Sequence, residues 1–126
     1  YQKTHGYHWN VVGPNFRGLH LLLEEQYNEI WNSVDEIAER IRALGQTAPM
    51  GADAFGNLTS IKDGDPGLSA QDMLKDLIKG NETTVATLKK AAEVADEAGD
   101  ISTNDLCTQR ITAHEKHLWM LKSSLA

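Results

Sequence analysis

The feature that most constrains the fold is a stretch from Phe16 to Leu44 with no proline and a single glycine near its start. Its apolar residues recur with the 3.6-residue period of a helix and fall on one face, and Gly45 follows as a stop signal. We expect the core face to consist of Phe16, Leu19, Leu23, Ile30, Val34, Ile37, Ile41 and Leu44. We expect the opposite, solvent face to consist of Glu25, Glu29, Asn32, Glu36 and Arg40. The sequence therefore predicts one long amphipathic helix.

Shorter elements are expected on either side of this helix. Tyr1–His8 looks like the end of a helix whose N-terminal part, with any tail, is missing, and Asn15 is a plausible cap for the long helix after the break at Gly13-Pro14. Residues 46–68 are rich in glycine and contain two prolines, so they form a long connection. A connection of that length usually carries structure of its own, and 52–61 suits a short helix.

The second half of the chain predicts two further long helices. Ser69 with Asp72 resembles a capping box that opens a helix to about residue 98, interrupted at Gly80. Ser102 or Thr103 then caps a last helix to about residue 124. No stretch alternates with the period of a strand. The expected fold is all-α, one domain over 1–126, with four main helices and one long crossover, which is the connectivity of ferritin-like bundles.

Composition narrows the functional classes. The formal net charge is −6, so the chain suits cations better than the phosphates of DNA. No run approaches the ~18 apolar residues of a membrane span. The single cysteine, Cys107, excludes an intramolecular disulfide framework. These features predict a cytoplasmic protein without membrane contact, with nucleoid association left open.

A third stripe on the long helix lies between the core and solvent faces. It carries His20, Glu24, Asp35 and Glu39, at about 0°, 40°, 60° and 100° on the helical wheel. Within each pair the residues are one turn apart and can share a metal ion. Glu24 and Asp35 are separated by roughly 16 Å along the axis. One straight helix therefore cannot bring all four side chains to one ion.

Two copies of the helix can bring these four side chains together. If they pack antiparallel about a two-fold axis midway between residues 29 and 30, His20 and Glu24 of one copy face Glu39 and Asp35 of the other, and two equivalent sites result. Nitrogen and carboxylate ligands without a thiolate suit Fe(II), Mn(II) or Zn(II), and iron adds redox chemistry. The alternative interpretation is that these acids are solvated and that their symmetric spacing is chance.

Several motifs resemble one known family. Residues 3–45 read KTHGYHWNVVGPNFRGLHLLLEEQYNEIWNSVDEIAERIRALG, and TQRITAHEKHLWML follows near the end. In their order and spacing these motifs resemble the Dps family of mini-ferritins, over nearly the whole chain. The resemblance implies a ferritin-like four-helix bundle with a short extra helix in the crossover, a dodecamer built from two-fold dimers, and ferroxidase sites at the dimer interface.

The resemblance also assigns site residues. The expected iron ligands are His8 of the HWN motif, His20, Glu24 (where many relatives have Asp), Asp35 and Glu39. The implied reaction is oxidation of Fe(II), preferentially by hydrogen peroxide, with storage of Fe(III) mineral in a hollow shell and protection of DNA from oxidative damage. Zn²⁺ or Mn²⁺ can substitute for iron at such a site.

Other residues have competing interpretations. Trp9 and Trp31 lie beside the ligands and could quench stray oxidising equivalents, but the simpler interpretation is that they pack at the dimer interface. Asp105 resembles the acid that lines the iron-entry pore in the family, with Asp96 and Asp100 nearby. The alternative is that these acids simply lie near helix ends.

The remaining histidines and the cysteine are expected to be structural. His5 lies three residues before His8 and is interpreted as a helix or interface residue. His114 and His117 form H-E-x-H, which lacks the metalloprotease spacing. Cys107 is expected to be a small buried side chain.

Three rival functions remain. A nucleoid-type protein that protects DNA physically would need a basic tail, and none is visible in this sequence. A di-iron enzyme with its site inside one bundle would use Glu-x-x-His on two helices, and the motif is absent. A purely structural bundle would leave the five matched ligand positions unexplained.

Overall fold

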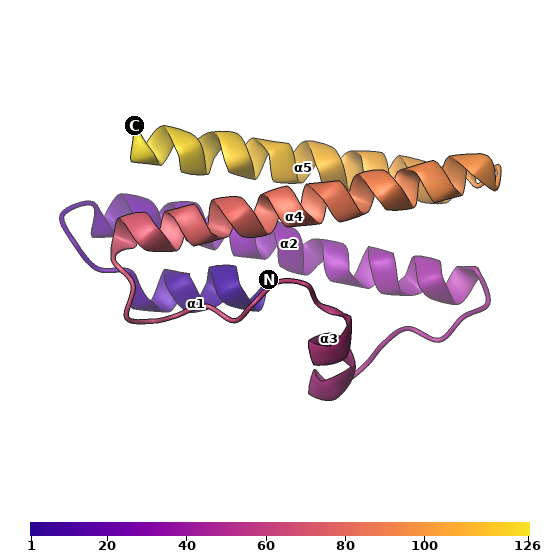
Figure 1. Ribbon diagram of the computed structural model, residues 1–126, viewed down its shortest axis with the longest axis horizontal. Coiled ribbons are helices and arrows are strands. Elements are labelled where there is room, and N and C mark those ends of the chain that lie inside the picture. Colours follow the sequence, from indigo (N-terminus) through magenta and orange to yellow (C-terminus); the bar gives the residue numbers. More distant parts are fainter.

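The computed structural model describes all residues from 1 to 126. They form five helices joined by loops, without strands (Figure 1). The helices are α1 (Gln2–Asn10), α2 (Phe16–Ala43), α3 (Ala52–Leu58), α4 (Ala70–Glu97) and α5 (Ile101–Leu125). The all-α prediction and the short helix in the crossover are confirmed.

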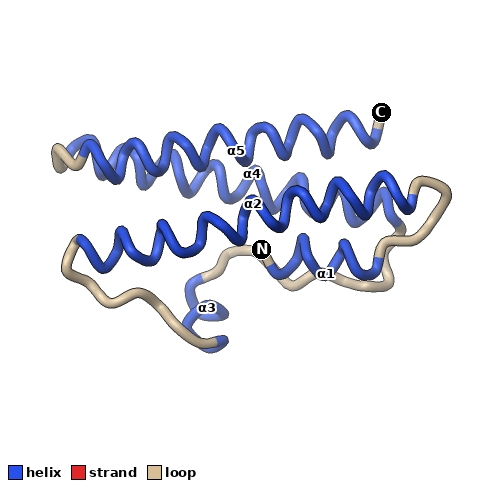
Figure 2. Tube along the Cα trace, turned by 180° about the vertical axis from the view of Figure 1, so that it is seen from behind, coloured by secondary structure: helices blue, strands red, loops and turns tan.

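The three long helices run side by side along the length of the bundle, and α1 follows only one half of α2 (Figures 1 and 2). The most extensive packing joins α4 with α5, and the next most extensive joins α1 with α2. The crossover that carries α3 returns from the far end of α2 to the start of α4 and passes close to α1 (Figure 1). No helix combines the length and the apolar character needed to cross a membrane.

The helix ends follow from local sequence, with one correction. The backbone N–H of Asp72 donates to the Ser69 hydroxyl at 3.1 Å, so the predicted cap of α4 is confirmed. The cap of α5 is Asp100, not Ser102 or Thr103, because its carboxylate accepts from the backbone N–H of Thr103 at 3.0 Å. Asn15 precedes α2 as expected, but its side chain makes no capping hydrogen bond.

Glycines mark the turns at the ends of two helices, whereas a third glycine lies within a helix and does not interrupt it. Gly45 and Gly99 have φ values of 91° and 70°, in the region that residues with a Cβ rarely adopt. The predicted interruption at Gly80 is wrong, because α4 continues through it. A Cβ at that position would lie 3.9 Å from the side chain of Ile61 in the crossover.

The buried core lies at the end of the bundle where α1 packs on α2. Its fully buried members are Tyr7, Val11, Leu23, Met73, Leu74, Leu77 and Leu121. On α2 the buried positions are Leu23, Gln26 and Ser33, so the packed stripe is rotated towards polar residues relative to the predicted core face. Four predicted core residues are more than a third exposed in the single chain: Phe16, Val34, Ile37 and Leu44. That part of the core prediction is wrong for one copy of the chain.

Two residues expected on the solvent face of α2 instead join α2 to α5. Glu29 pairs with Arg110, and Arg40 donates to Asp100 at 2.7 Å and to the Thr103 hydroxyl at 2.9 Å. The rotation of the packed stripe explains the error, because it brings this edge of α2 against its neighbour.

A polar anchor fixes α1, which carries His8. The Tyr7 hydroxyl donates to Asp76 on α4 at 2.6 Å and accepts from the backbone N–H of Asp65 in the crossover at 3.2 Å. Lys3 pairs with the same Asp76 carboxylate at 3.0 Å. Burial and the hydrogen bond to Asp76 raise the pKa of Tyr7 to about 12. The first helix is therefore tied both to α4 and to the crossover.

Candidate metal centre

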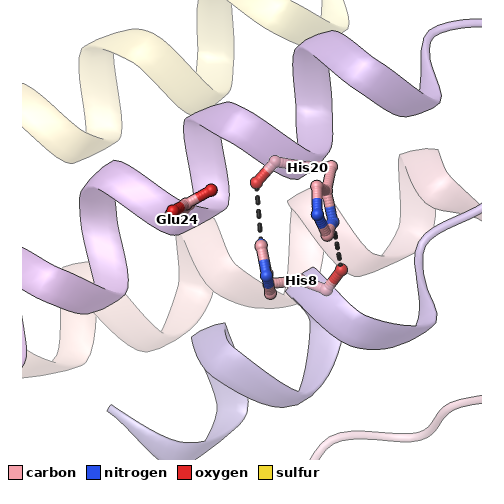
Figure 3. A group of neighbouring side chains, drawn as sticks. All are labelled: His8, His20 and Glu24. Carbon is pink, nitrogen blue, oxygen red and sulfur yellow. Dashed lines mark hydrogen bonds between the residues drawn. The ribbon is translucent and has the colours of Figure 1, made fainter.

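Three of the five predicted ligands meet where α1 packs against the start of α2. His8 comes from α1, and His20 and Glu24 come from successive turns of α2 (Figure 3). One ligand atom from each residue lies within 4.8 Å of the others. His8 is buried, whereas His20 and Glu24 are half-buried. We call these three residues the edge cluster.

The hydrogen bonds of the two histidines are reciprocal. Nδ1 of His8 lies 2.8 Å from the carbonyl oxygen of His20, and Nδ1 of His20 lies 2.8 Å from the carbonyl oxygen of His8 (Figure 3). A carbonyl oxygen only accepts, so each Nδ1 must carry the proton and donate it. An imidazole that donates from Nδ1 offers Nε2 as its ligand atom for a metal ion, and the carbonyl oxygen behind each ring holds Nδ1 in place, as is usual for metal-binding histidines.

The donor set fits a first-row divalent cation. Two imidazole nitrogens and one carboxylate, with no thiolate, suit iron, manganese or zinc. The two rings stack with centroids 3.7 Å apart and planes at 16°. No cation from a lysine or arginine is bonded to these three side chains, so the carboxylate is free to neutralise a bound metal.

The other two predicted ligands lie elsewhere on the same helix. Asp35 and Glu39 are exposed on the second half of α2, and neither belongs to the edge cluster. This is the separation that their distance along the helix requires. Their predicted role, as ligands for a second copy of the chain, stays a prediction.

Aromatic residues surround the cluster. His5 stacks on Tyr27 with centroids 3.7 Å apart and is not part of the metal-competent set. Trp9 and Trp31 are 67% and 56% exposed. Their exposure in one chain suits packing against another copy, and their redox role stays a prediction.

The predicted pore acids differ in their surroundings. Asp105 is exposed and accepts from the side-chain amide of Gln109 at 2.8 Å. Asp96 is exposed as well. Asp100 is engaged as the α5 cap and by Arg40, and its pKa is lowered chiefly by the hydrogen bonds from Thr103. Asp105 and Asp96 therefore keep the freer carboxylates, and their role in a pore stays a prediction.

A second group of histidines lies inside the bundle. The interior cluster consists of Glu29, Arg110, His114 and His117. Arg110 makes a bidentate pair with Glu29 and donates to Nε2 of His114 at 3.2 Å, while Nδ1 of His114 donates to the Asn81 side-chain oxygen at 2.8 Å. Burial, helped by Arg110, lowers the pKa of His114 to about 4.

The other interior histidine is less completely paired. Nε2 of His117 lies 3.5 Å from Glu29, and its Nδ1 has no hydrogen-bond partner. Burial lowers the pKa of His117, and the bond from Arg110 lowers the pKa of Glu29. The expectation that His114 and His117 are structural agrees with this arrangement. Sequence reasoning missed their partner Glu29, although Glu29 lies at the edge of the packed stripe and Arg110, His114 and His117 follow at helical spacing.

Comparisons with known proteins place this arrangement in a family. The model of the ferritin-like domain matches residues 1–126. The DNA protection during starvation protein of Brevibacillus brevis is 39% identical over 125 residues, which cover 99% of this chain and 84% of that protein. The fold and the histidine–carboxylate cluster thus define a ferritin-like protein.

Solved structures narrow the class further. Dps from Thermosynechococcus elongatus superposes with a TM-score of 0.96 at 36% identity, covering 99% of this chain and 80% of that one. Dps from Vibrio cholerae O1, described as a member of a broad superfamily of ferritin-like diiron-carboxylate proteins, gives 0.94 at 30% identity, with coverage of 99% and 79%. The chain belongs to the Dps family of mini-ferritins.

Proposed function

We propose that this protein oxidises and stores iron, with Fe(II) as substrate and a ferroxidase site shared between two copies of the chain. The observation that carries the proposal is the reciprocal pair of hydrogen bonds between His8 and His20, which leaves both Nε2 atoms free beside Glu24. By contrast, both nitrogens of the interior residue His114 are engaged, so that histidine has none left for a metal ion.

The second half of the site comes from the partner copy in this proposal. The antiparallel arrangement predicted from the spacing brings Asp35 of the partner subunit and Glu39 of the partner subunit to the edge cluster. Two further carboxylates add negative charge and oxygen ligands, which favour Fe(III) after oxidation. The exposed Trp31, Val34 and Ile37, which recur at helical spacing on α2, support a homo-oligomer, because apolar side chains gathered on one exposed helix face indicate an interface.

In the proposed reaction the residues of this chain bind and orient the substrate. The imidazoles supply neutral ligands of fixed direction, and the carboxylates offset the charge of the cation. Two Fe(II) ions give one electron each to one hydrogen peroxide, which takes up two protons and leaves as two waters. This two-electron route releases no hydroxyl radical, so it would protect DNA while Fe(III) mineral is stored in a dodecameric shell. Zn²⁺ and Mn²⁺ are expected to compete for the site.

The alternative is a nucleoid-type protein that protects DNA by binding it. The name of the Brevibacillus brevis relative, DNA protection during starvation protein, favours this second function. The net charge of −6 opposes it, because a negatively charged assembly repels phosphates. An electrophoretic shift assay at low salt separates the two, since retarded DNA without iron would support direct binding.

The decisive experiment follows iron oxidation by the purified assembly. Fe(II) is added anaerobically, then hydrogen peroxide, and ferric absorbance is recorded for the native chain and for a variant with His20→Ala and Asp35→Ala. Native oxidation with about one peroxide per two irons, lost in an assembled variant, supports the proposal. Equal rates in both proteins, or a native rate no faster than in buffer, would refute it.

A further inference from the structure

Aromatic side chains pack against both ligand histidines of the edge cluster. The ring of Phe16 stacks on that of His20, with centroids 4.9 Å apart and planes at 30°. The ring of Tyr27 meets that of His8 edge-on, at 5.1 Å and 69°. Phe16 lies one turn before His20 on α2 and Tyr27 lies two turns after it, so helical spacing places both rings beside the cluster.

These aromatic contacts limit the movement of the imidazole rings that the hydrogen bonds still allow. The bond from Nδ1 fixes the tautomer and one atom of each imidazole, but the ring can still tilt about that atom. A neighbouring aromatic face or edge limits the tilt, because such pairs have preferred geometries. Tyr27 is itself held from another side, since His5 stacks on it at 3.7 Å with planes at 13°. The planes of both ligand rings are therefore set by packing before any metal binds.

We propose that Phe16 and Tyr27 are positioning residues of the metal centre. Phe16 adds to the mutual stacking of the two imidazoles in holding the plane of His20, and Tyr27 does the same for His8, so that the ligand atoms stay within 4.8 Å of one another and of Glu24. The inference rests on the proposed function, because it assumes that these histidines bind metal. It explains why Phe16, predicted to belong to the core, is 44% exposed yet packs on a ligand ring.

The test uses Co(II) as a spectroscopic probe, without any oxidation step. Its visible absorption reports the number and geometry of ligands, and titration of the purified native assembly gives the affinity. Phe16→Leu and Tyr27→Leu remove the ring but keep an apolar side chain. Loss of a residue that orients a ligand typically costs 10–100-fold in metal affinity, so we expect Kd to rise about tenfold in each variant, with an altered spectrum.

Matched variants separate positioning from mere packing. Phe16→Tyr and Tyr27→Phe keep a ring, so we expect the native spectrum and a Kd within about threefold of the native value, well below the 10–100-fold effect of losing an orienting partner. Leu21→Ala changes an exposed side chain on the same helix and serves as the control. Far-UV circular dichroism and assembly size verify folding. Where a leucine variant does not fold, the methionine variant at that position repeats the test.

Each outcome decides the matter. Native affinity and spectrum in the folded leucine variants would overturn the proposal. An equal loss in the ring-retaining variants would also overturn it, because the ring plane would then be irrelevant. A native chain that binds no Co(II) would instead refute the metal centre itself, so failure of the inference and failure of the proposed function are distinguishable.

Discussion

The edge of the bundle and its interior each hold two histidines and a glutamate, but in different hydrogen-bonding surroundings. In the edge cluster, His8 and His20 donate to backbone carbonyls and keep Nε2 free. In the interior cluster, both nitrogens of His114 are engaged and Arg110 already neutralises the carboxylate. Residue types therefore do not define a metal site. What defines it is which nitrogen remains free and whether a cation already occupies the place beside the acid.

The comparison implies opposite responses to mutation. The interior cluster should contribute to stability and not to metal binding, because Arg110 already neutralises Glu29 and engages His114, although Nδ1 of His117 stays unpaired. The edge cluster should contribute to metal binding and little to stability, because its unused lone pairs can reach a ligand from outside. The predictions below separate these two roles.

The largest effect is expected in the interior. Arg110→Ala leaves Glu29 without its cation, and we expect the free energy of unfolding to fall by about 3 kcal/mol, the lower end of the range for breaking a buried pair. The lower end applies because the Glu29 side chain is 38% exposed and can be partly hydrated, whereas that of Arg110 is only 7% exposed. Urea unfolding measures the change.

The control for this variant removes both charges. Arg110→Leu combined with Glu29→Leu should recover more than half of the lost stability, because no uncompensated charge remains. Co(II) affinity should be native in the folded variants. A large loss of Co(II) affinity in Arg110→Ala would contradict the division of roles between the two clusters.

The next effect concerns binding at the edge. His20→Ala removes one of the two free Nε2 atoms, and we expect Co(II) and Zn(II) affinity to fall by about 100-fold, comparable with about 2.7 kcal/mol of binding free energy. The free energy of unfolding should change by less than about 1 kcal/mol, because His20 is half-buried and its Nδ1 bond is a single hydrogen bond. Isothermal titration and urea unfolding of the same samples test both statements. Full retention of metal affinity would show that the cluster is structural.

The third effect is the dependence of stability on pH. The folded pKa of His114 is about 4, against an ordinary value of 6.5. Below pH 6.5 the unfolded chain takes up a proton that the folded chain refuses until about pH 4, so stability is complete above pH 6.5 and is lost as pH falls through this window. Between pH 7 and pH 5 the expected loss is about 2 kcal/mol from this residue.

Several groups face His114 and set the direction of this effect. Burial disfavours its protonation most and Arg110 on α5 adds to this, whereas Glu29 on α2 favours it and α4 contributes the neutral Asn81. His117, whose pKa is also lowered, adds in the same direction. His114→Gln should reduce the slope between pH 7 and pH 5 measured by urea unfolding. An unchanged slope in this variant would assign the dependence to other groups.

The sequence predicted most of the fold because helix signals are local. The capping box at Ser69, the stops at Gly45 and Gly99 and the short helix in the crossover all depend on neighbouring residues. The failures have non-local causes. Asp100 caps α5 because its side chain also pairs with Arg40 of another helix. Gly80 does not break α4 because packing along its length holds that helix.

The candidate site divides in the same way. Helical spacing alone put His20 and Glu24 on one stripe, and the family resemblance added His8 from another helix. The reciprocal hydrogen bonds could not be predicted, since they depend on how α1 crosses α2. The role of Glu29 was missed because a helical wheel shows which residues share a face but not how far that face turns when it meets a neighbour.

The smallest predicted effect concerns the length of the Glu24 side chain in the edge cluster. Aspartate offers the same carboxylate as Glu24 on a shorter side chain, so the site should tolerate either length. Glu24→Asp draws the carboxylate back by one methylene, away from ligand atoms that lie within 4.8 Å of it in the native chain. We expect Co(II) affinity to fall by less than about tenfold, or about 1.4 kcal/mol.

The Co(II) absorption should change more than the affinity, because it reports geometry directly. Glu25→Asp, on the exposed neighbour, is the matched control and should change neither. If Glu24→Asp lost as much affinity as His20→Ala, the reach of this carboxylate would be essential, and the edge cluster would be a site fitted to glutamate rather than one that accepts either acid.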